Sequence, residues 1–125
     1  MPRNKKGIFC LEGDWSRHLE QSSSVEPILA LMAKWEPHYV PYIHRNVSTK
    51  ESLRSYLGLW ARKHYRGYPL LYLAFHGNPG VICLGNECHD GNQITLDLLE
   101  DYLRGKCSGR IIYFGSCGTL GAHGN

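Results

Sequence analysis

The sequence predicts an α/β fold whose mainly parallel sheet carries helices on both faces, and three observations lead to this prediction. Short apolar runs alternate with segments of helical period along all 125 residues, which implies right-handed crossovers between parallel strands. The runs at 68–76 and 110–114 are largely apolar and bounded by Gly or Pro, as buried parallel strands are. Pro41 interrupts a third run and places it at a sheet edge. We expect one domain spanning residues 1–125 with strand order 2-1-3-4.

The first half of the chain is predicted to hold two strands and two helices. Residues 7–11 read as a short buried strand that leads into a polar loop with Gly13 as its hinge. The serines at 22–24 offer an N-cap for a helix that ends near residue 36. Residues 39–43 form the edge strand. A capping-box spacing at 48–51 starts the second helix, which is expected to end at Gly67.

The second half is predicted to deliver two reactive side chains. The strand at 68–76 ends in His76, after which the chain turns into a small hairpin over the rim of the sheet. Thr95 caps a third helix that stops at Gly105. The strand at 110–114 then leads into Cys117. The third and fourth strands are therefore expected to lie side by side.

Composition excludes several classes of protein. Hydrophobic residues make up 42% and charged residues 20% of the chain, which is typical of a globular protein. The net charge of +3 is spread thinly and without a nucleic-acid-binding motif. No run approaches membrane-spanning length and no signal peptide is evident. Five cysteines, an odd number without framework spacing, favour reduced thiols in a cytoplasmic protein.

His76 and Cys117 point to covalent catalysis. Both follow the carboxyl ends of strands that are predicted to be neighbours about 4.8 Å apart, where ligands bind in open α/β sheets. A thiol needs a nearby base to become a nucleophile, and an imidazole provides one. The backbone N–H groups of Gly77 and Cys117 can form an oxyanion hole. These residues together predict acyl transfer by a cysteine and histidine dyad.

The arrangement resembles the caspase-like (clan CD) cysteine peptidases, which include caspases, metacaspases and bacterial CHAT-domain proteases. His76-Gly77 looks like the family's His-Gly, residues 116–118 look like its motif around the nucleophile, and residues 80–85 correspond to its hairpin. The similarity extends over nearly all of the chain from Gly7 onward. It implies a three-layer fold with a six-stranded sheet, and an endopeptidase that works through a thioester acyl-enzyme, with His76 as acid and base and no cofactor.

The resemblance covers the large-subunit half of that family. The sequence ends eight residues after Cys117, whereas the family continues with about two more strands. We therefore expect a remaining C-terminal fragment, a partner chain or a second copy to cover the fourth strand, because exposed apolar edges are usually covered. In the family the loop after the first strand contacts the substrate side chain before the cleaved bond. Arg17 would hold an acidic side chain there, and Asp14, near Glu12, a basic one.

Two other functions remain open from the sequence. A degenerate peptidase fold can act as an adaptor or oligomerisation module without catalysis. A small zinc-binding domain is the second alternative, because thiolate and imidazole are zinc ligands and three of four candidates cluster in one polar segment. The four candidates are Cys83, Cys88, His89 and Cys107. A nucleotide-binding domain is disfavoured, since no Gly-rich phosphate loop follows the first strand.

Overall fold

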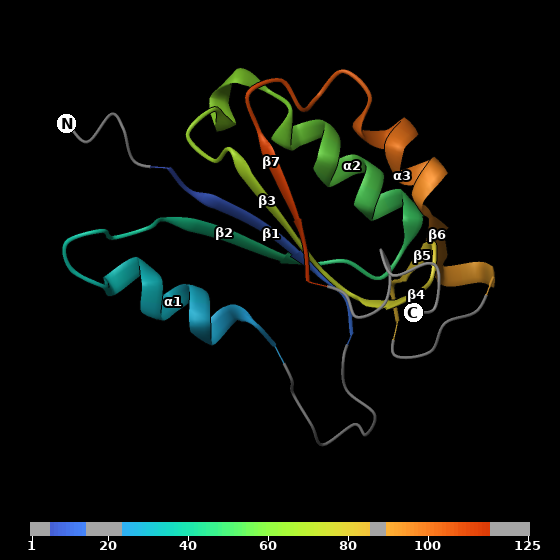
Figure 1. The fold of residues 1–125 in the computed structure, drawn as a ribbon, viewed down its shortest axis with the longest axis horizontal. Helices are drawn as coiled ribbons and strands as arrows, with labels where there is room; N and C mark the ends of the chain where they lie inside the picture. The colour runs from blue at the N-terminus through green and yellow to red at the C-terminus, as the bar shows by residue number, and fades with distance from the viewer. Residues whose placement is uncertain (1–5, 15–23, 86–89, 116–125) are drawn as a thin grey trace.

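A four-stranded parallel sheet forms the centre of the computed structural model, which describes residues 6–14, 24–85 and 90–115 (Figure 1). Every pair of neighbouring strands in this sheet is parallel. The strand order is β2-β1-β3-β7, which confirms the predicted order 2-1-3-4. Pro41 stands directly before the edge strand β2, as its missing N–H requires. The strands are β1 (Ile8–Glu12), β2 (Tyr42–Asn46), β3 (Leu70–Ala74) and β7 (Ile111–Phe114).

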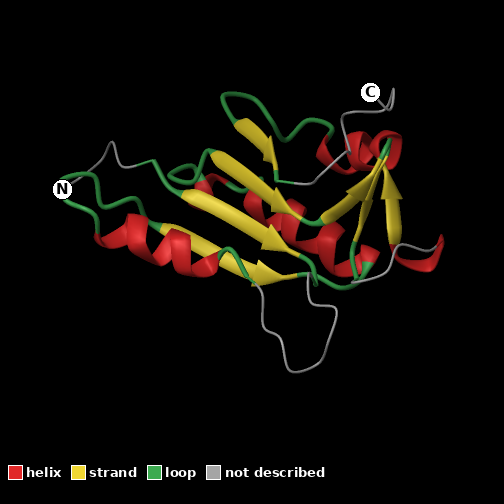
Figure 2. Cartoon of the chain, turned by 60° about the horizontal axis from the view of Figure 1, so that its bottom comes forward, coloured by secondary structure: helices red, strands yellow, loops and turns green. Residues whose placement is uncertain are grey.

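Helices lie on both faces of the sheet, as predicted, but they cover them unequally. Helices α2 (Lys50–Trp60) and α3 (Leu96–Leu103) pack on one face, here called the back face. Helix α1 (Glu26–Lys34) is the one described helix on the opposite front face, where Leu29 meets Ile8 and Cys10. Figure 2 shows α1 in front of the β2 side of the sheet, while no described helix crosses β3 and β7 on this face.

The hydrophobic core occupies the back face. Alternate residues of each strand point to this side, so that Phe9 and Leu71 meet the apolar stripes of α2 and α3. Trp60 is 1% exposed, and its ring stacks on Phe9 with centroids 6.3 Å apart. The Trp60 Nε1 donates a hydrogen bond of 2.7 Å to the carbonyl of Tyr68. On the ring of Trp60 lies the guanidinium of Arg110, 4.1 Å from the centroid.

A second, antiparallel sheet sits at the carboxyl end of the first one. It has the order β4-β5-β6, which confirms the predicted hairpin and adds a third strand directly before α3, where none was predicted. The turn of the hairpin places Gly80 at φ 79°, a conformation that favours glycine. Strand β3 ends at Ala74, so His76 opens the hairpin and does not end the parallel strand as predicted. The strands are β4 (His76–Asn78), β5 (Val81–Cys83) and β6 (Gln93–Thr95).

Two helix starts differ from the sequence prediction. Helix α1 has Val25 at its N-cap without a side-chain cap. Ser24, one residue earlier, accepts from the N–H of Glu26 at 3.0 Å and donates to Glu12. The capping box of α2 uses Thr49 and Ser52, one residue beyond the predicted spacing. That helix ends at Trp60, and a short 3₁₀ helix (Lys63–Tyr65) follows before Gly67.

The start of α3 matches its prediction. The backbone N–H of Leu98 donates to the Thr95 hydroxyl at 3.1 Å. None of the described helices is long and apolar enough to cross a membrane.

Candidate functional site

The carboxyl ends of three neighbouring strands converge at one rim of the molecule. Leu73 of β3 lies opposite Phe114 of β7, and the N–H of Gly115 donates to the carbonyl of Leu73 at 2.9 Å. On the other side of β3, the N–H of Gly13 donates to the carbonyl of Ala74 at 2.9 Å. The predicted neighbour relation between the strands that lead to His76 and to Cys117 is therefore confirmed.

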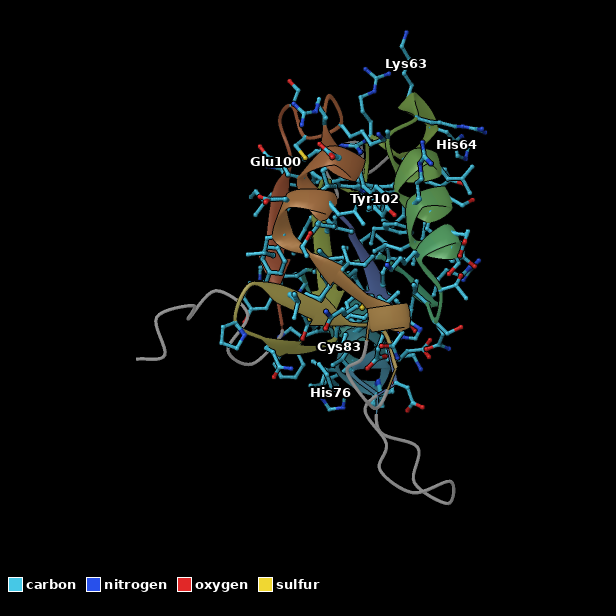
Figure 3. All side chains as sticks on the ribbon, turned by 90° about the vertical axis from the view of Figure 1, so that its right-hand side faces the viewer. Lys63, His64, His76, Cys83, Glu100 and Tyr102 are labelled. Atoms are coloured by element: carbon cyan, nitrogen blue, oxygen red, sulfur yellow. The ribbon has the colours of Figure 1, made fainter. Side chains whose placement is uncertain are left out.

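His76 lies on this rim, two residues beyond the end of β3. It is partly exposed and stands opposite Cys83 in the hairpin, and Figure 3 shows both residues at the same end of the molecule, away from Lys63. Cys117 lies outside the described residues. His76 follows Leu73 by three residues, and Cys117 follows Phe114 by the same number. Two segments of equal length thus leave a pair of strands that are in register.

Gly77 presents a backbone amide at the outer edge of the hairpin. It lies opposite Ile82, between the pairs that β4 makes at His76 and Asn78. In an antiparallel ladder hydrogen-bonded and non-bonded pairs alternate, and a two-residue turn closes with a bonded pair. The closing pair here is Asn78 with Val81. Gly77 therefore occupies a non-bonded position, and its N–H points away from β5.

Two glycines allow the chain to pass close to its neighbours at this rim. A Cβ atom at Gly13 would lie 2.6 Å from the ring of Phe75 and 2.8 Å from the carbonyl oxygen of Leu84. A Cβ atom at Gly115 would lie 2.5 Å from the ring of Tyr72. Real Cβ atoms do not approach so closely, so a side chain at either position would force its neighbours to shift, the Leu84 backbone among them at Gly13. Gly13 was predicted to act as a hinge. In the structure its lack of a side chain allows the chain to pack closely against Phe75, next to His76.

The residues proposed for substrate binding are only partly described. Asp14 is exposed, and its N–H donates to the carbonyl of Leu84 at 3.3 Å, which ties the start of the loop to the hairpin. Arg17 lies outside the described residues. Glu12 belongs to strand β1 and is 1% exposed, so it does not share the loop with Asp14 as the sequence analysis assumed.

Glu12 forms a buried hydrogen-bonded cluster that the sequence analysis missed. One carboxylate oxygen accepts from the Ser24 hydroxyl at 2.7 Å and lies 2.7 Å from Nε2 of His44, while the other accepts from the N–H of Val25 at 2.9 Å. A buried carboxylate requires such partners. The signal in the sequence was the alternation of Ile8, Cys10 and Glu12 on one face of β1, which places this carboxylate on the α1 side.

A second carboxylate extends the cluster towards solvent. Nδ1 of His44 lies 3.6 Å from Glu26, and the Tyr42 hydroxyl donates to Glu26 at 3.2 Å. Burial, followed by the hydrogen bond to Glu26 and the charge of Glu26, raises the pKa of Tyr42. Because Ser24, Val25 and Glu26 begin α1, the cluster fastens that helix to β1 and β2. We therefore interpret it as a structural anchor at the end of the loop that follows β1.

The described cysteines differ in state. Burial, followed by the charges of Glu12 and Glu26, raises the pKa of Cys10 to about 12. Cys107 is a free thiol whose Sγ lies 3.6 Å from the carbonyl of Leu103. Cys83 is disulfide-bonded, so the expectation of reduced thiols throughout is wrong for this residue.

Only two of the four residues predicted as zinc ligands, Cys83 and Cys107, lie among the described residues. A disulfide sulfur has no thiolate to offer to a metal, so Cys83 is not a ligand in this form. Cys88 and His89 lie outside the described residues. Within residues 6–14, 24–85 and 90–115 no group of three potential metal-ligating side chains occurs. Zinc analysis of the reduced protein is the test that this prediction still needs.

The comparisons with known proteins give a family without an assigned activity. The chain belongs to the family described as "Family of unknown function (DUF6642)", whose match covers residues 5–123. A search of curated proteins found no match. The match includes both His76 and Cys117.

Proposed function

We propose that the protein is a cysteine endopeptidase in which Cys117 attacks the peptide carbonyl and His76 is the acid and base. The observation that carries this proposal is the hydrogen bond from Gly115 to Leu73, which joins the ends of β7 and β3. Three residues reach at most about 10 Å. Segments of that length from neighbouring strands can bring an imidazole and a thiol within hydrogen-bonding distance.

The steps follow from the chemistry of these groups. His76 takes the thiol proton of Cys117, the thiolate adds to the scissile carbonyl, and the N–H of Gly77 donates to the oxyanion that forms. His76 then protonates the leaving amine, and a thioester remains on Cys117. Water, deprotonated by His76, hydrolyses the thioester. The outward direction inferred for the Gly77 amide supports its role, because an N–H held within the ladder could not serve.

Labelling with a peptidyl acyloxymethyl ketone tests the proposal. In this probe a catalytic thiolate attacks the methylene carbon beside the ketone and displaces the carboxylate, which leaves a thioether on the cysteine. Probes with Asp or Arg before the ketone also test Arg17 and Asp14. We expect one modification, at Cys117, that is lost in Cys117→Ala and reduced at least about tenfold in His76→Ala, since a lost general base typically costs 10²–10⁴ in rate.

The matched control is Cys107→Ala, which removes a partly exposed thiol away from the rim and should leave labelling unchanged. Circular dichroism establishes that the His76→Ala and Cys117→Ala variants remain folded. Labelling of Cys117 at the rate of Cys107 in the wild-type protein would contradict a peptidase.

An inactive adaptor or oligomerisation module is the second candidate, and the edge strand β7 favours it. Ile111 and Tyr113 of this strand are 65% and 57% exposed, which is unusual for apolar residues in a sheet. In either function we propose that another polypeptide covers this edge, be it a C-terminal fragment, a partner chain or a second copy. The probe experiment separates the two functions, because an adaptor leaves Cys117 as unreactive as an ordinary thiol.

We also propose that the protein works in the cytoplasm, since five cysteines without framework spacing favour reduced thiols. The Cys83 disulfide makes this testable. Alkylation of thiols in intact cells before lysis, followed by mass spectrometry, should find Cys83 alkylated in a reducing compartment. Recovery of Cys83 only in its disulfide would argue for an oxidising one.

A further inference from the structure

The outer edge of β7 lacks the features that usually prevent strands from pairing. Among the described residues β7 pairs with β3 alone, so no described strand takes up the N–H and C=O groups on its other side. Edge strands are commonly protected by proline, a bulge or a charged side chain. Arg110, the charged residue directly before this strand in the sequence, turns inward, because its guanidinium donates to the carbonyl of Trp60 at 2.7 Å and stacks on that ring.

Apolar surface flanks the edge on both faces of the sheet. On the front face Ile111 and Tyr113 are exposed, and the ring of Tyr113 contacts Tyr72 at a centroid distance of 5.2 Å. On the back face a groove of about 390 Å³ lies between β7 and α3. Leu99 of α3 and Ile112 of β7 are among its apolar walls, and the charged side chains of Glu100 and Arg104 line it as well.

We propose that β7 pairs with β7 of a second copy of this chain, antiparallel across a two-fold axis near Ile112, so that two sheets form one continuous sheet. We choose a second copy as the partner because the exposed edge of β7 is complementary to itself. In an antiparallel pair opposite residues share a face, so a two-fold at Ile112 sets Ile111 against Tyr113 of the second copy, twice. Pairs of aromatic and β-branched residues stabilise antiparallel strands.

The charges on α3 favour the same two-fold. The axis also brings the two α3 helices together in antiparallel directions on the back face. Glu100 and Arg104 lie one turn apart on the groove side of α3, where Figure 3 labels Glu100. An antiparallel neighbour centred between them places Glu100 of each copy beside Arg104 of the other. Arg104 already contacts Asp101 at 2.6 Å, and both side chains remain largely exposed, so Arg104 can take a second partner.

The interface would be of modest size. Four-residue edges and one pair of helices bury roughly 600–800 Å² per copy, at the lower end of standard interfaces. We therefore expect a reversible dimer with a dissociation constant on the order of 10 µM. The inference does not depend on the proposed peptidase activity, because the surface excludes His76 and Cys117, and the Cys117→Ala variant should dimerise like the wild-type chain.

A charge-swap pair tests the proposal by sedimentation velocity. In Glu100→Arg each contact across the axis joins two positive side chains, the new arginine of one copy and Arg104 of the other. In Arg104→Glu each contact joins two negative side chains. We expect each variant to weaken self-association at least about fivefold, since like charges oppose pairing. Mixed in equal amounts the two should associate as a heterodimer, because each cross-axis contact then joins opposite charges. Thermal melts confirm that both remain folded.

Ile111→Lys tests the edge itself, and Leu31→Lys is its matched control. Both replace an exposed apolar side chain, but Leu31 lies on α1. Ile111→Lys should leave a monomer at about 200 µM, twentyfold above the expected dissociation constant, whereas Leu31→Lys should dimerise normally. A wild-type monomer at that concentration, or a dimer that resists Ile111→Lys, overturns the proposal. So does failure of the mixed charge variants to pair.

Discussion

The two faces of the parallel sheet are built from similar residues and have different exposures. On the back face Phe9, Leu11 and Leu71 are sealed by α2 and α3. On the front face α1 seals Cys10, but Tyr113 remains exposed on the neighbouring half of the sheet. The back face therefore holds most of the apolar surface removed from water, which is the main source of folding free energy.

The front face combines a polar anchor with uncovered apolar surface. The Glu12 and His44 cluster fixes one end of α1 and lies at the same carboxyl rim as His76. Uncovered apolar surface lies at the far edge, on β7. Within the described residues one helix is fastened to β1 and β2, and no helix covers the β7 half of this face, where we propose that a second copy binds. The experiments below test this division, starting with the largest expected effect.

Truncation of the back-face core should cost the most stability. Trp60→Ala removes a fully buried ring, its hydrogen bond to the Tyr68 carbonyl and the surface on which Arg110 stacks. We expect the free energy of unfolding to fall by about 4 kcal/mol, as for other buried aromatic residues. Urea denaturation followed by circular dichroism measures this.

The matched front-face variant is Tyr113→Ala, an exposed aromatic residue of β7. At concentrations where the chain is monomeric its loss should cost less than about 1 kcal/mol, because little apolar area is buried there. Equal losses for Trp60→Ala and Tyr113→Ala would mean that the two faces do not differ as described.

Loss of the polar anchor should have the next largest effect. Glu12→Gln keeps the shape of the side chain but removes the charge that Ser24, Val25 and His44 surround. Hydrogen bonds to a buried charge are worth about 1.5–3 kcal/mol, and we expect a loss of about 2 kcal/mol. Glu51→Gln, on the exposed first turn of α2, is the control and should change stability by less than about 0.5 kcal/mol.

Amide hydrogen exchange distinguishes an anchor from a general loss of stability. The amides of α1 should exchange faster in Glu12→Gln, while those of α2 follow only the global change in stability. Uniformly faster exchange in both helices would contradict the assignment of this cluster to α1.

The sequence was sufficient to predict the order of the strands. It was insufficient to predict the side-chain contacts between them and the point where β3 ends. Pro41 and the alternation of elements determined the order, because both act through local backbone chemistry and crossover handedness. The meeting of Glu12 with His44 depends on the register of β1 against β2, which the local pattern does not specify. The apolar run at 68–76 gave no sign that the chain leaves the parallel sheet before His76. Cys117, the other half of the predicted dyad, lies outside the described residues.

Close packing at the rim should have a moderate effect on stability. Gly13→Ala forces a Cβ atom against the Leu84 carbonyl and the Phe75 ring, next to His76. We expect a loss of about 1–2 kcal/mol, typical of overpacking, together with slower probe labelling of Cys117. Gly58→Ala is the control, because nothing lies within 4 Å of its added Cβ. In the interior of α2 it should stabilise by about 0.5–1 kcal/mol, and destabilisation by both variants would contradict the rim packing.

The smallest effect concerns chemical reactivity and leaves stability unchanged. Cys10 lies under α1 on the covered half of the front face, and burial raises its pKa from 9.0 to about 12. At pH 8 this leaves about a thousandfold less thiolate than an unperturbed thiol has, and the thiolate is the form that reacts. Iodoacetamide should therefore modify the partly exposed Cys107 well before Cys10, as measured by peptide mass spectrometry. The thiolate fraction of Cys10 rises tenfold per pH unit until the pH approaches 12, so its labelling should accelerate between pH 8 and pH 10. Equal rates at pH 8 would show that α1 does not close this half of the face, and the contrast between the covered β1 side and the open β7 side would fail.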